Sequence, residues 1–281
     1  MTPRTPHRRL IAAPAALLLA LVAGLAASPA PASAYAPAGQ ATIHPGVQMV
    51  TAGAQCTANF VFADGADTYI GYAAHCAGLG EATDTDGCLA GTLPVGTAVE
   101  IDGASQPGTL AYSSWATMQA VGETDADTCA YNDLALVRIA PADVAKVNPS
   151  IPHWGGPTGL NTTGVPATTR VYSYGNSSLR LGLTQLSPKT GISLGTTGGG
   201  WTHPVYTVTP GIPGDSGSAF LDAQGRALGV LSTLAIAPTP LSNNVSDLSR
   251  ALDYMHAHGG PSATLVQGDL AFDGSKLPLG I

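Results

Sequence analysis

Short apolar runs alternate with turn-forming residues along most of the chain from Gln55 onward. Runs of this length and spacing predict β-strands. Pairs such as Asp64-Gly65 between the runs indicate turns. The strands that we expect cover residues 57–62, 69–74, 134–139, 170–174, 179–186, 204–208, 219–221 and 227–234. The pattern therefore predicts an all-β chain built as a barrel or a sandwich.

One amphipathic helix is predicted near the end of the chain, over residues 247–256. Ser246 is a suitable N-cap, and Gly259-Gly260-Pro261 would end the helix. Its apolar face would consist of Leu248, Ala251, Leu252 and Met255. No other segment gives a convincing helical pattern.

The segment 149–164 is rich in Pro and Gly and divides the strand pattern into two halves. We interpret it as a linker between two β-domains, residues 54–148 and residues 165–245. The predicted helix and a tail without a clear signal make up residues 246–281. Residues 35–53 form a lead that is either a small pro-segment or simply the start of the mature chain.

Residues 1–34 have the features of a secretory signal peptide. A basic start with Arg8 and Arg9 precedes an apolar run over residues 10–27, and Ala32-Ser33-Ala34 offers a cleavage site. The alternative is a membrane anchor, which Pro14 and the lack of following stop-transfer charges disfavour. Arg8-Arg9 leaves open whether export uses a twin-arginine signal. We therefore expect a secreted, extracellular protein.

Composition agrees with a folded, exported domain. The 281 residues are 44% hydrophobic and 10% charged, which suits a chain that buries a core rather than a disordered one. Removing residues 1–34 takes away three of the 11 basic residues and none of the 18 acidic ones, which leaves a net charge of −10. An acidic surface argues against nucleic acid and anionic membranes as partners, and we expect a monomer.

The chain contains four cysteines: Cys56, Cys76, Cys88 and Cys129. An even number in an exported protein favours two disulfides. A bridge between Cys56 and Cys76 would close a short loop and hold the segment that carries His75. A zinc site is the alternative, but the chain has no Cys-x-x-Cys pair and no helical His pair. We expect no metal and no cofactor.

Ser216 is the candidate nucleophile, in the stretch Gly214-Asp215-Ser216-Gly217-Ser218. Glycines on both sides permit a tight turn that brings a substrate carbonyl close to the serine. The amides of Gly214 and Ser216 could then form an oxyanion hole. The same residues are also common in plain surface turns, so the motif needs support from elsewhere in the chain.

Two further residues supply that support. His75 ends an apolar run in Ala73-Ala74-His75-Cys76, where a base could activate a serine. Asp133 heads the apolar run Leu134-Ala135-Leu136-Val137, where a carboxylate could orient an imidazole. Taken alone, the first would be a structural histidine and the second a turn residue. Their order along the chain, His, Asp and Ser with separations of 58 and 83 residues, makes the set more informative.

These elements resemble the chymotrypsin-like serine proteases, in particular the exported bacterial, streptogrisin-like members. The resemblance covers residues 50–254, and the order His-Asp-Ser differs from those of subtilisins and α/β-hydrolases. It implies two antiparallel β-barrels with a cleft between them and a C-terminal α-helix. It also implies that His75 is the general base, Asp133 its orienter and Ser216 the acyl-forming nucleophile, with the oxyanion hole at the Gly214 and Ser216 amides.

The resemblance extends to the substrate pocket, with departures. Ser232 matches the serine whose strand pairs with substrate backbone. Pro210 replaces the Asp of trypsin-like members, which argues against Lys or Arg specificity, and Leu234 could narrow the pocket. We therefore expect a preference for small or medium apolar side chains. The disulfide that flanks the nucleophile in the family is absent, so Cys88 and Cys129 must pair if Cys56 and Cys76 do.

Asp215 needs a positive partner in this fold. Digestive relatives supply it as a new N-terminus, but no clear activation site precedes Cys56. We hypothesise that Arg170 or Arg180 takes this role.

The sequence thus predicts a secreted serine endopeptidase that cleaves protein or peptide substrates through an acyl-enzyme. A catalytically silent binding protein with a protease fold is the alternative, although such proteins usually lack one of the three residues. An esterase or lipase fits less well, because Ser218 departs from the Gly-x-Ser-x-Gly motif.

Overall fold

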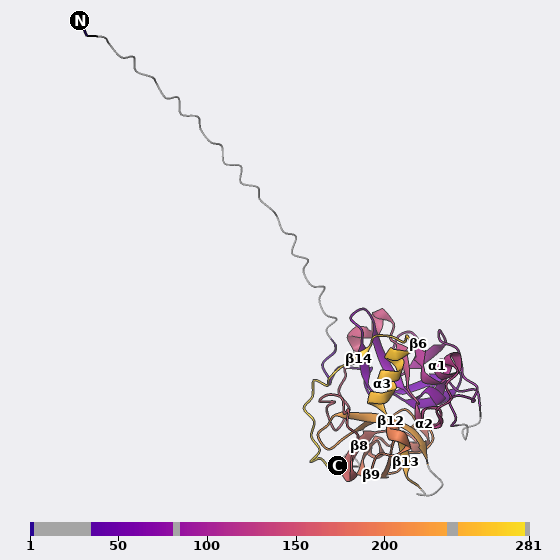
Figure 1. The fold of residues 1–281 in the computed structure, drawn as a ribbon. Helices are drawn as coiled ribbons and strands as arrows, with labels where there is room; N and C mark the ends of the chain where they lie inside the picture. The colour runs from indigo at the N-terminus through magenta and orange to yellow at the C-terminus, as the bar shows by residue number, and fades with distance from the viewer. Residues whose placement is uncertain (3–34, 81–84, 235–240, 279–281) are drawn as a thin grey trace. The chain divides into compact units, whose positions relative to one another are not determined.

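The computed structural model describes residues 35–80, 85–234 and 241–278, together with Met1 and Thr2 (Figure 1). The predicted signal peptide lies outside these residues, apart from the first two. None of the described helices is long and apolar enough to cross a membrane.

Two antiparallel β-structures form the fold. The first is an eight-stranded open sheet in the order β14-β3-β4-β7-β6-β5-β1-β2, and the second is a closed six-stranded barrel in the order β10-β13-β12-β11-β8-β9. The sheet contains β1 (Gln48–Thr51), β2 (Ala54–Thr57), β3 (Val61–Ala63), β4 (Thr68–Tyr72), β5 (Ala98–Ile101), β6 (Gly108–Ser113), β7 (Ala135–Arg138) and β14 (Thr264–Leu265). The barrel contains β8 (Ala167–Tyr174), β9 (Pro188–Leu194), β10 (Thr202–Val208), β11 (Ala219–Leu221), β12 (Ala227–Leu234) and β13 (Asn243–Asp247). The predicted all-β class is confirmed, although only the second barrel closes.

The C-terminal helix is confirmed as α3 (Leu248–Ala257), with its N-cap one residue later than predicted. The Asp247 side chain accepts a hydrogen bond from the Arg250 amide at 2.8 Å and so caps the helix. Two more helices, α1 (Ser114–Val121) and α2 (Ala126–Tyr131), were not predicted. Short 3₁₀ helices are η1 (Ala74–Ala77), η2 (Pro141–Lys146), η3 (Ser178–Arg180), η4 (Thr184–Leu186) and η5 (Gly198–Gly200).

The strand predicted over residues 179–186 is wrong. This segment contains η3 and η4 instead. Its leucines alternate as they would in a half-buried strand, but here Arg180 points inward and is buried, while Leu179 and Leu181 are exposed. A buried charge, rather than apolar burial, determines the conformation of this segment.

Residues 35–53 are part of the folded unit. Ile43 and Met49 are fully buried, and β1 pairs with both β2 and β5. The first sheet therefore begins before residue 54, where we expected the domain to start.

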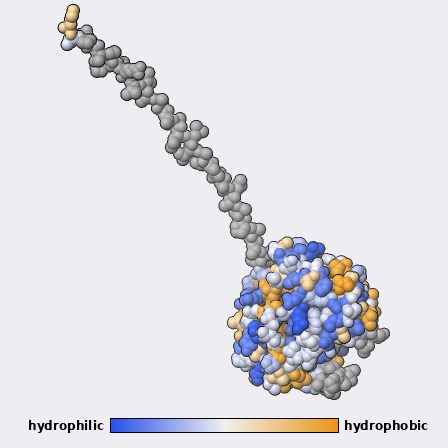
Figure 2. Space-filling model, in the orientation of Figure 1, coloured by the Kyte–Doolittle hydropathy of each residue, from blue (hydrophilic) through white to orange (hydrophobic). Residues whose placement is uncertain are grey.

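The C-terminal tail joins the first sheet to the linker and the barrel. Its strand β14 pairs with β3, and beyond it the Leu270 carbonyl accepts a hydrogen bond from Gly156 of the linker at 2.9 Å. Phe272 then packs edge-on against Tyr172 of β8, with ring centroids 5.1 Å apart. On the face shown in Figure 2, hydrophobic residues lie in separate patches among hydrophilic ones, as on an ordinary protein surface.

The tail should contribute to stability through Phe272. Replacing it with Ala removes a half-buried ring, and we expect a loss of about 2 kcal/mol in the free energy of unfolding. Chemical denaturation of the mature protein measures this loss. The matched control is Leu277→Ala, which trims an exposed side chain of the same tail and should change stability by less than about 0.5 kcal/mol. Equal effects of the two variants would show that Phe272 does not hold the tail in place.

Candidate active site

His75 and Asp133 form a close pair at the ends of neighbouring strands. His75 lies on η1, just after β4, and Asp133 lies two residues before β7, which pairs with β4. The His75 Nδ1 lies 2.7 Å from Asp133 Oδ2, and the His75 backbone amide donates to Asp133 Oδ1 at 2.9 Å. With a proton on Nδ1, the other ring nitrogen of His75 is left as a base.

The pair changes the acid–base behaviour of His75. Burial by itself lowers the pKa of His75, but the negative charge of Asp133 and its hydrogen bond raise it, and the net effect is a pKa above the ordinary value of 6.5. The imidazole therefore gains a proton more readily than a free histidine would. A general base that must hold a proton in the transition state benefits from this shift.

The structure contains both predicted disulfides, Cys56–Cys76 and Cys88–Cys129. The first ties β2 to η1 beside His75, and the second ties the segment before β5 to α2, four residues before Asp133. Each bridge lies in one of the two clusters of metal-ligating residue types within the described residues. Because disulfide sulfurs are not thiolates, these clusters do not offer cysteine ligands to a metal.

Ser216 lies in the same cleft as His75 and Asp133. The cleft has a volume of about 680 Å³, and Gly214 also lines it. The Ser216 carbonyl accepts a hydrogen bond from the Thr57 amide at 2.8 Å, which fixes the turn around Ser216 against the first sheet. No acceptor within the described part of the chain binds the amides of Gly214 or Ser216, so both remain able to bind an oxyanion.

Gly214 needs to be a glycine for two reasons. Its φ is +91°, a region that favours glycine, and an added Cβ would lie 2.5 Å from the Gln55 side chain. Its carbonyl accepts hydrogen bonds from Gln55 at 3.0 Å and from Thr57 at 2.8 Å. The turn therefore attaches to β2 through its carbonyl groups.

Two of the three predicted pocket residues, Ser232 and Leu234, line the cleft, and both lie on β12. Pro210 is not among the described residues that line it, and its carbonyl instead accepts a hydrogen bond from Arg180 at 3.1 Å. Ser232 also donates to Asp133 Oδ2 at 2.6 Å, a third hydrogen bond to this carboxylate, which was not predicted from the sequence.

Asn243 is a further lining residue that was not predicted. Its Oδ1 accepts from the Gly211 amide at 2.8 Å, and its Nδ2 lies 3.4 Å from the Thr233 carbonyl. The side chain thus connects the segment before Ser216 with β12. A buried polar residue in β13 gives no signal in the sequence that distinguishes it from a structural asparagine.

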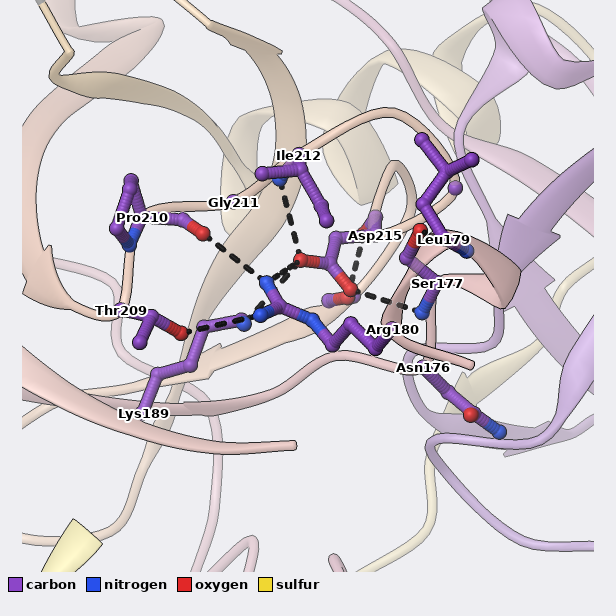
Figure 3. Close-up of polar contacts among 12 residues, drawn as sticks. Asn176, Ser177, Leu179, Arg180, Lys189, Thr209, Pro210, Gly211, Ile212 and Asp215 are labelled. Atoms are coloured by element: carbon purple, nitrogen blue, oxygen red, sulfur yellow. Dashed lines mark hydrogen bonds and ion pairs between the residues drawn. The ribbon is translucent and has the colours of Figure 1, made fainter. Parts of the chain in front are cut away.

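Asp215 is completely buried and is neutralised from inside the protein (Figure 3). Arg180 Nη2 lies 2.6 Å from its Oδ2, which confirms one of the two predicted arginines; Arg170 instead lies exposed on β8. Lys189 of β9 adds a second cation at 3.2 Å, which was not predicted. The backbone amides of Ser177 and Ile212 complete the set at 3.0 and 3.1 Å.

Lys189 is unusual because its ammonium group has no access to water. Burial lowers the pKa of Lys189 from 10.5 to about 8, and the positive charge of Arg180 also acts in this direction, while Asp215 acts against it. The cluster therefore holds two cations for one carboxylate at neutral pH. With its pKa lowered to about 8, Lys189 loses its proton in mildly alkaline solution.

No protein-family model and no curated protein matches the chain. Among solved structures, it is similar to Protease A of Thermobifida fusca, with 19% sequence identity, 80% of this chain and 99% of that chain covered, and a TM-score of 0.52. It is also similar to a chymotrypsin of Cellulomonas bogoriensis, with 18% identity, 80% and 98% coverage, and a TM-score of 0.46. The first similarity shows that this chain has the chymotrypsin fold.

Lys189 predicts how stability depends on pH. Between pH 8 and 10.5 the unfolded chain binds more protons than the folded one at this site, so the free energy of unfolding should rise with pH, by up to roughly 3 kcal/mol over the whole interval. Denaturation between pH 7.5 and 9.5 measures the rise. It should be present in the wild type and in the exposed control Lys276→Met, and absent in Lys189→Met. An identical pH dependence in all three would contradict this assignment.

Proposed function

We propose that this protein is a secreted serine endopeptidase. His75 accepts the Ser216 proton as the hydroxyl attacks the carbonyl of a peptide bond. Asp133 holds the imidazole in the required tautomer and stabilises its positive charge. The imidazolium then gives the proton to the leaving amine, and water releases the acyl group from Ser216 by the reverse route.

The observation that carries this proposal is the composition of one cleft. It brings together a histidine paired with a buried aspartate, a serine in a glycine-rich turn, and two backbone amides with no acceptor among the described residues. Each group meets one demand of acyl transfer: a base, a nucleophile and donors for the oxyanion. A turn with a purely structural role would need neither a base nor oxyanion donors beside its serine.

The Asp215 cluster argues against the alternative, a silent binding protein. The internal cations Arg180 and Lys189 hold Asp215, the residue before Ser216, in place. The turn therefore does not need the new N-terminus that zymogen cleavage creates in digestive relatives. The residues of the candidate triad are all present, and nothing in the described cleft replaces one with an inert side chain. Export agrees with the two disulfides, which persist in oxidising surroundings.

We further propose that the cleft takes small or medium apolar side chains on the acyl side of the bond. Ile212, Leu231 and Leu234 contribute apolar surface to it. Among the described lining residues, no Lys or Arg stands ready to bind an acidic side chain, and the only carboxylate, Asp133, is already bound to His75 and Ser232. A strong preference for Arg, Lys or Glu in a profile of cleaved peptides would contradict this assignment.

Labelling with a fluorophosphonate probe tests the nucleophile. The folded wild type should react at Ser216, whereas Ser216→Ala should not, because only an activated serine attacks the phosphorus. Ser218→Ala is not a useful control, since its hydroxyl donates to the Asp215 carbonyl, so Ser178→Ala in the exposed η3 segment serves instead and should label normally. Equal labelling of wild type and Ser216→Ala would contradict the proposal.

The pH profile of kcat/KM tests the roles of His75 and Asp133. Activity should fall as pH decreases through the raised pKa of His75, so the acidic limb should have its midpoint above 6.5. Asp133→Asn removes the charge that raises this pKa, so the midpoint should move to lower pH and kcat should fall by about 10⁴-fold. Asp253→Asn, on the exposed side of α3, should leave both unchanged. A midpoint that does not move in Asp133→Asn would contradict the pairing.

A further inference from the structure

Three leucines close together in the chain are exposed to solvent. Leu179, Leu181 and Leu183 expose 64%, 87% and 55% of their surface. Single exposed leucines are common, but a group of them at one place on the surface is a feature of binding sites. We call residues 177–186 the apolar loop.

The conformation of the apolar loop follows from Arg180. Its guanidinium extends inward to Asp215, Thr209 and the Pro210 carbonyl (Figure 3). With the charged side chain turned inward, the neighbouring leucines are left outside. Leu181 is also held at φ = +53°, a left-handed conformation that is unfavourable for a branched apolar residue. The buried Arg180 contacts explain why the leucines face outward, and the result is a set of apolar side chains that is open to solvent.

The apolar loop begins at the edge of the cleft. The Ser178 amide donates to the Gln55 side chain at 2.9 Å, and the Ser177 hydroxyl donates to the Pro213 carbonyl at 2.5 Å. Gln55 and Pro213 both line the cleft, as does Gly214, which Gln55 also contacts. A polypeptide that leaves the cleft over Gln55 and Gly214 therefore meets the apolar loop next.

This edge differs from the one assigned to the acyl side of the substrate. Ser232 and Leu234 on β12 are the residues proposed to contact the substrate before the scissile bond. The edge at Gln55 and Gly214 comes from β2 and the nucleophile turn instead. It is the part of the cleft that remains for the residues after the scissile bond.

We propose that the apolar loop binds apolar side chains on the leaving-group side of the substrate, an inference that rests on the proposed endopeptidase function. The protein would then select its cleavage sites by residues on both sides of the bond. Burying part of one leucine against a substrate side chain corresponds to an effect of about tenfold on selectivity.

The charge of the loop favours a peptide over a membrane as the occupant. Arg180 is its one basic residue, and it is buried against Asp215. Peripheral membrane binding through an apolar loop usually draws on exposed Lys or Arg beside it. The mature chain is also acidic overall, so anionic lipid would be repelled.

Acyl transfer to added nucleophiles tests the proposal directly. A small peptide methyl ester forms the acyl-enzyme without any residue on the leaving side, and the acyl group then partitions between water and a dipeptide amide. Leucyl-leucinamide and seryl-serinamide are the two acceptors. The wild type should favour the leucyl acceptor about tenfold. The double variant Leu179→Ser, Leu181→Ser should reduce this ratio to about one, while Leu277→Ser, an equally exposed leucine of the tail, should leave it unchanged.

The same experiment separates the two proposals. Hydrolysis of the methyl ester should be equal in wild type and double variant, because this substrate does not reach the apolar loop. An unchanged acceptor ratio in the double variant would overturn the inference while leaving the endopeptidase function intact. A parallel loss of ester hydrolysis would also overturn it, since the loop would then act through Arg180 and Asp215. No ester hydrolysis by the folded wild type would overturn both proposals. If the double variant lost binding to phosphatidylcholine vesicles while its acceptor ratio stayed that of the wild type, the loop would be assigned to lipid instead.

Discussion

The carboxylate of Asp215 is cut off from water and has to be neutralised by other groups inside the protein. Two cations, Arg180 from η3 and Lys189 from β9, and two backbone amides meet this requirement. The adjoining residues Gly214 and Ser216 have amides that no acceptor in the described part of the chain binds. The exposed leucines of the apolar loop accompany the same interaction, because Arg180 faces inward to Asp215 while Leu179 and Leu181 on either side of it face outward.

A second buried carboxylate, Asp133, organises the other half of the site. It accepts hydrogen bonds from the backbone and the ring of His75 and from the hydroxyl of Ser232. These two residues belong to different parts of the fold. The His75 contacts arise within the first sheet, and the Ser232 contact comes from the closed barrel. The arrangement of His75 and Asp133 therefore depends on both β-structures, which the tail also connects through β14 and Phe272.

Short sequence patterns predicted much of the fold and of the candidate site. The bounds of β11 and β12 agree with their apolar runs, α3 follows its periodicity, and both disulfides agree with the cysteine count and spacing. The helices α1 and α2 were missed because they are too short for a periodic pattern to stand out. The segment 179–186 was misassigned as a strand because its alternating leucines were expected to face the core and Arg180 to face solvent. The structure shows the reverse, with Arg180 buried and the leucines exposed. The contacts of Lys189, Ser232 and Asn243 join residues that are far apart in the sequence. A single sequence does not show which distant residues come together, so these contacts could not be predicted.

The most direct test of the account is to trap the acyl-enzyme. The mature protein is mixed with a peptide ester, quenched in acid during turnover and digested, and the modified peptide is identified by mass spectrometry. We predict an added acyl group on the peptide that contains Ser216, at a fraction that approaches one acyl group per protein when deacylation is slow. An adduct on another residue, or turnover without any adduct, would contradict the assignment of Ser216 as the nucleophile.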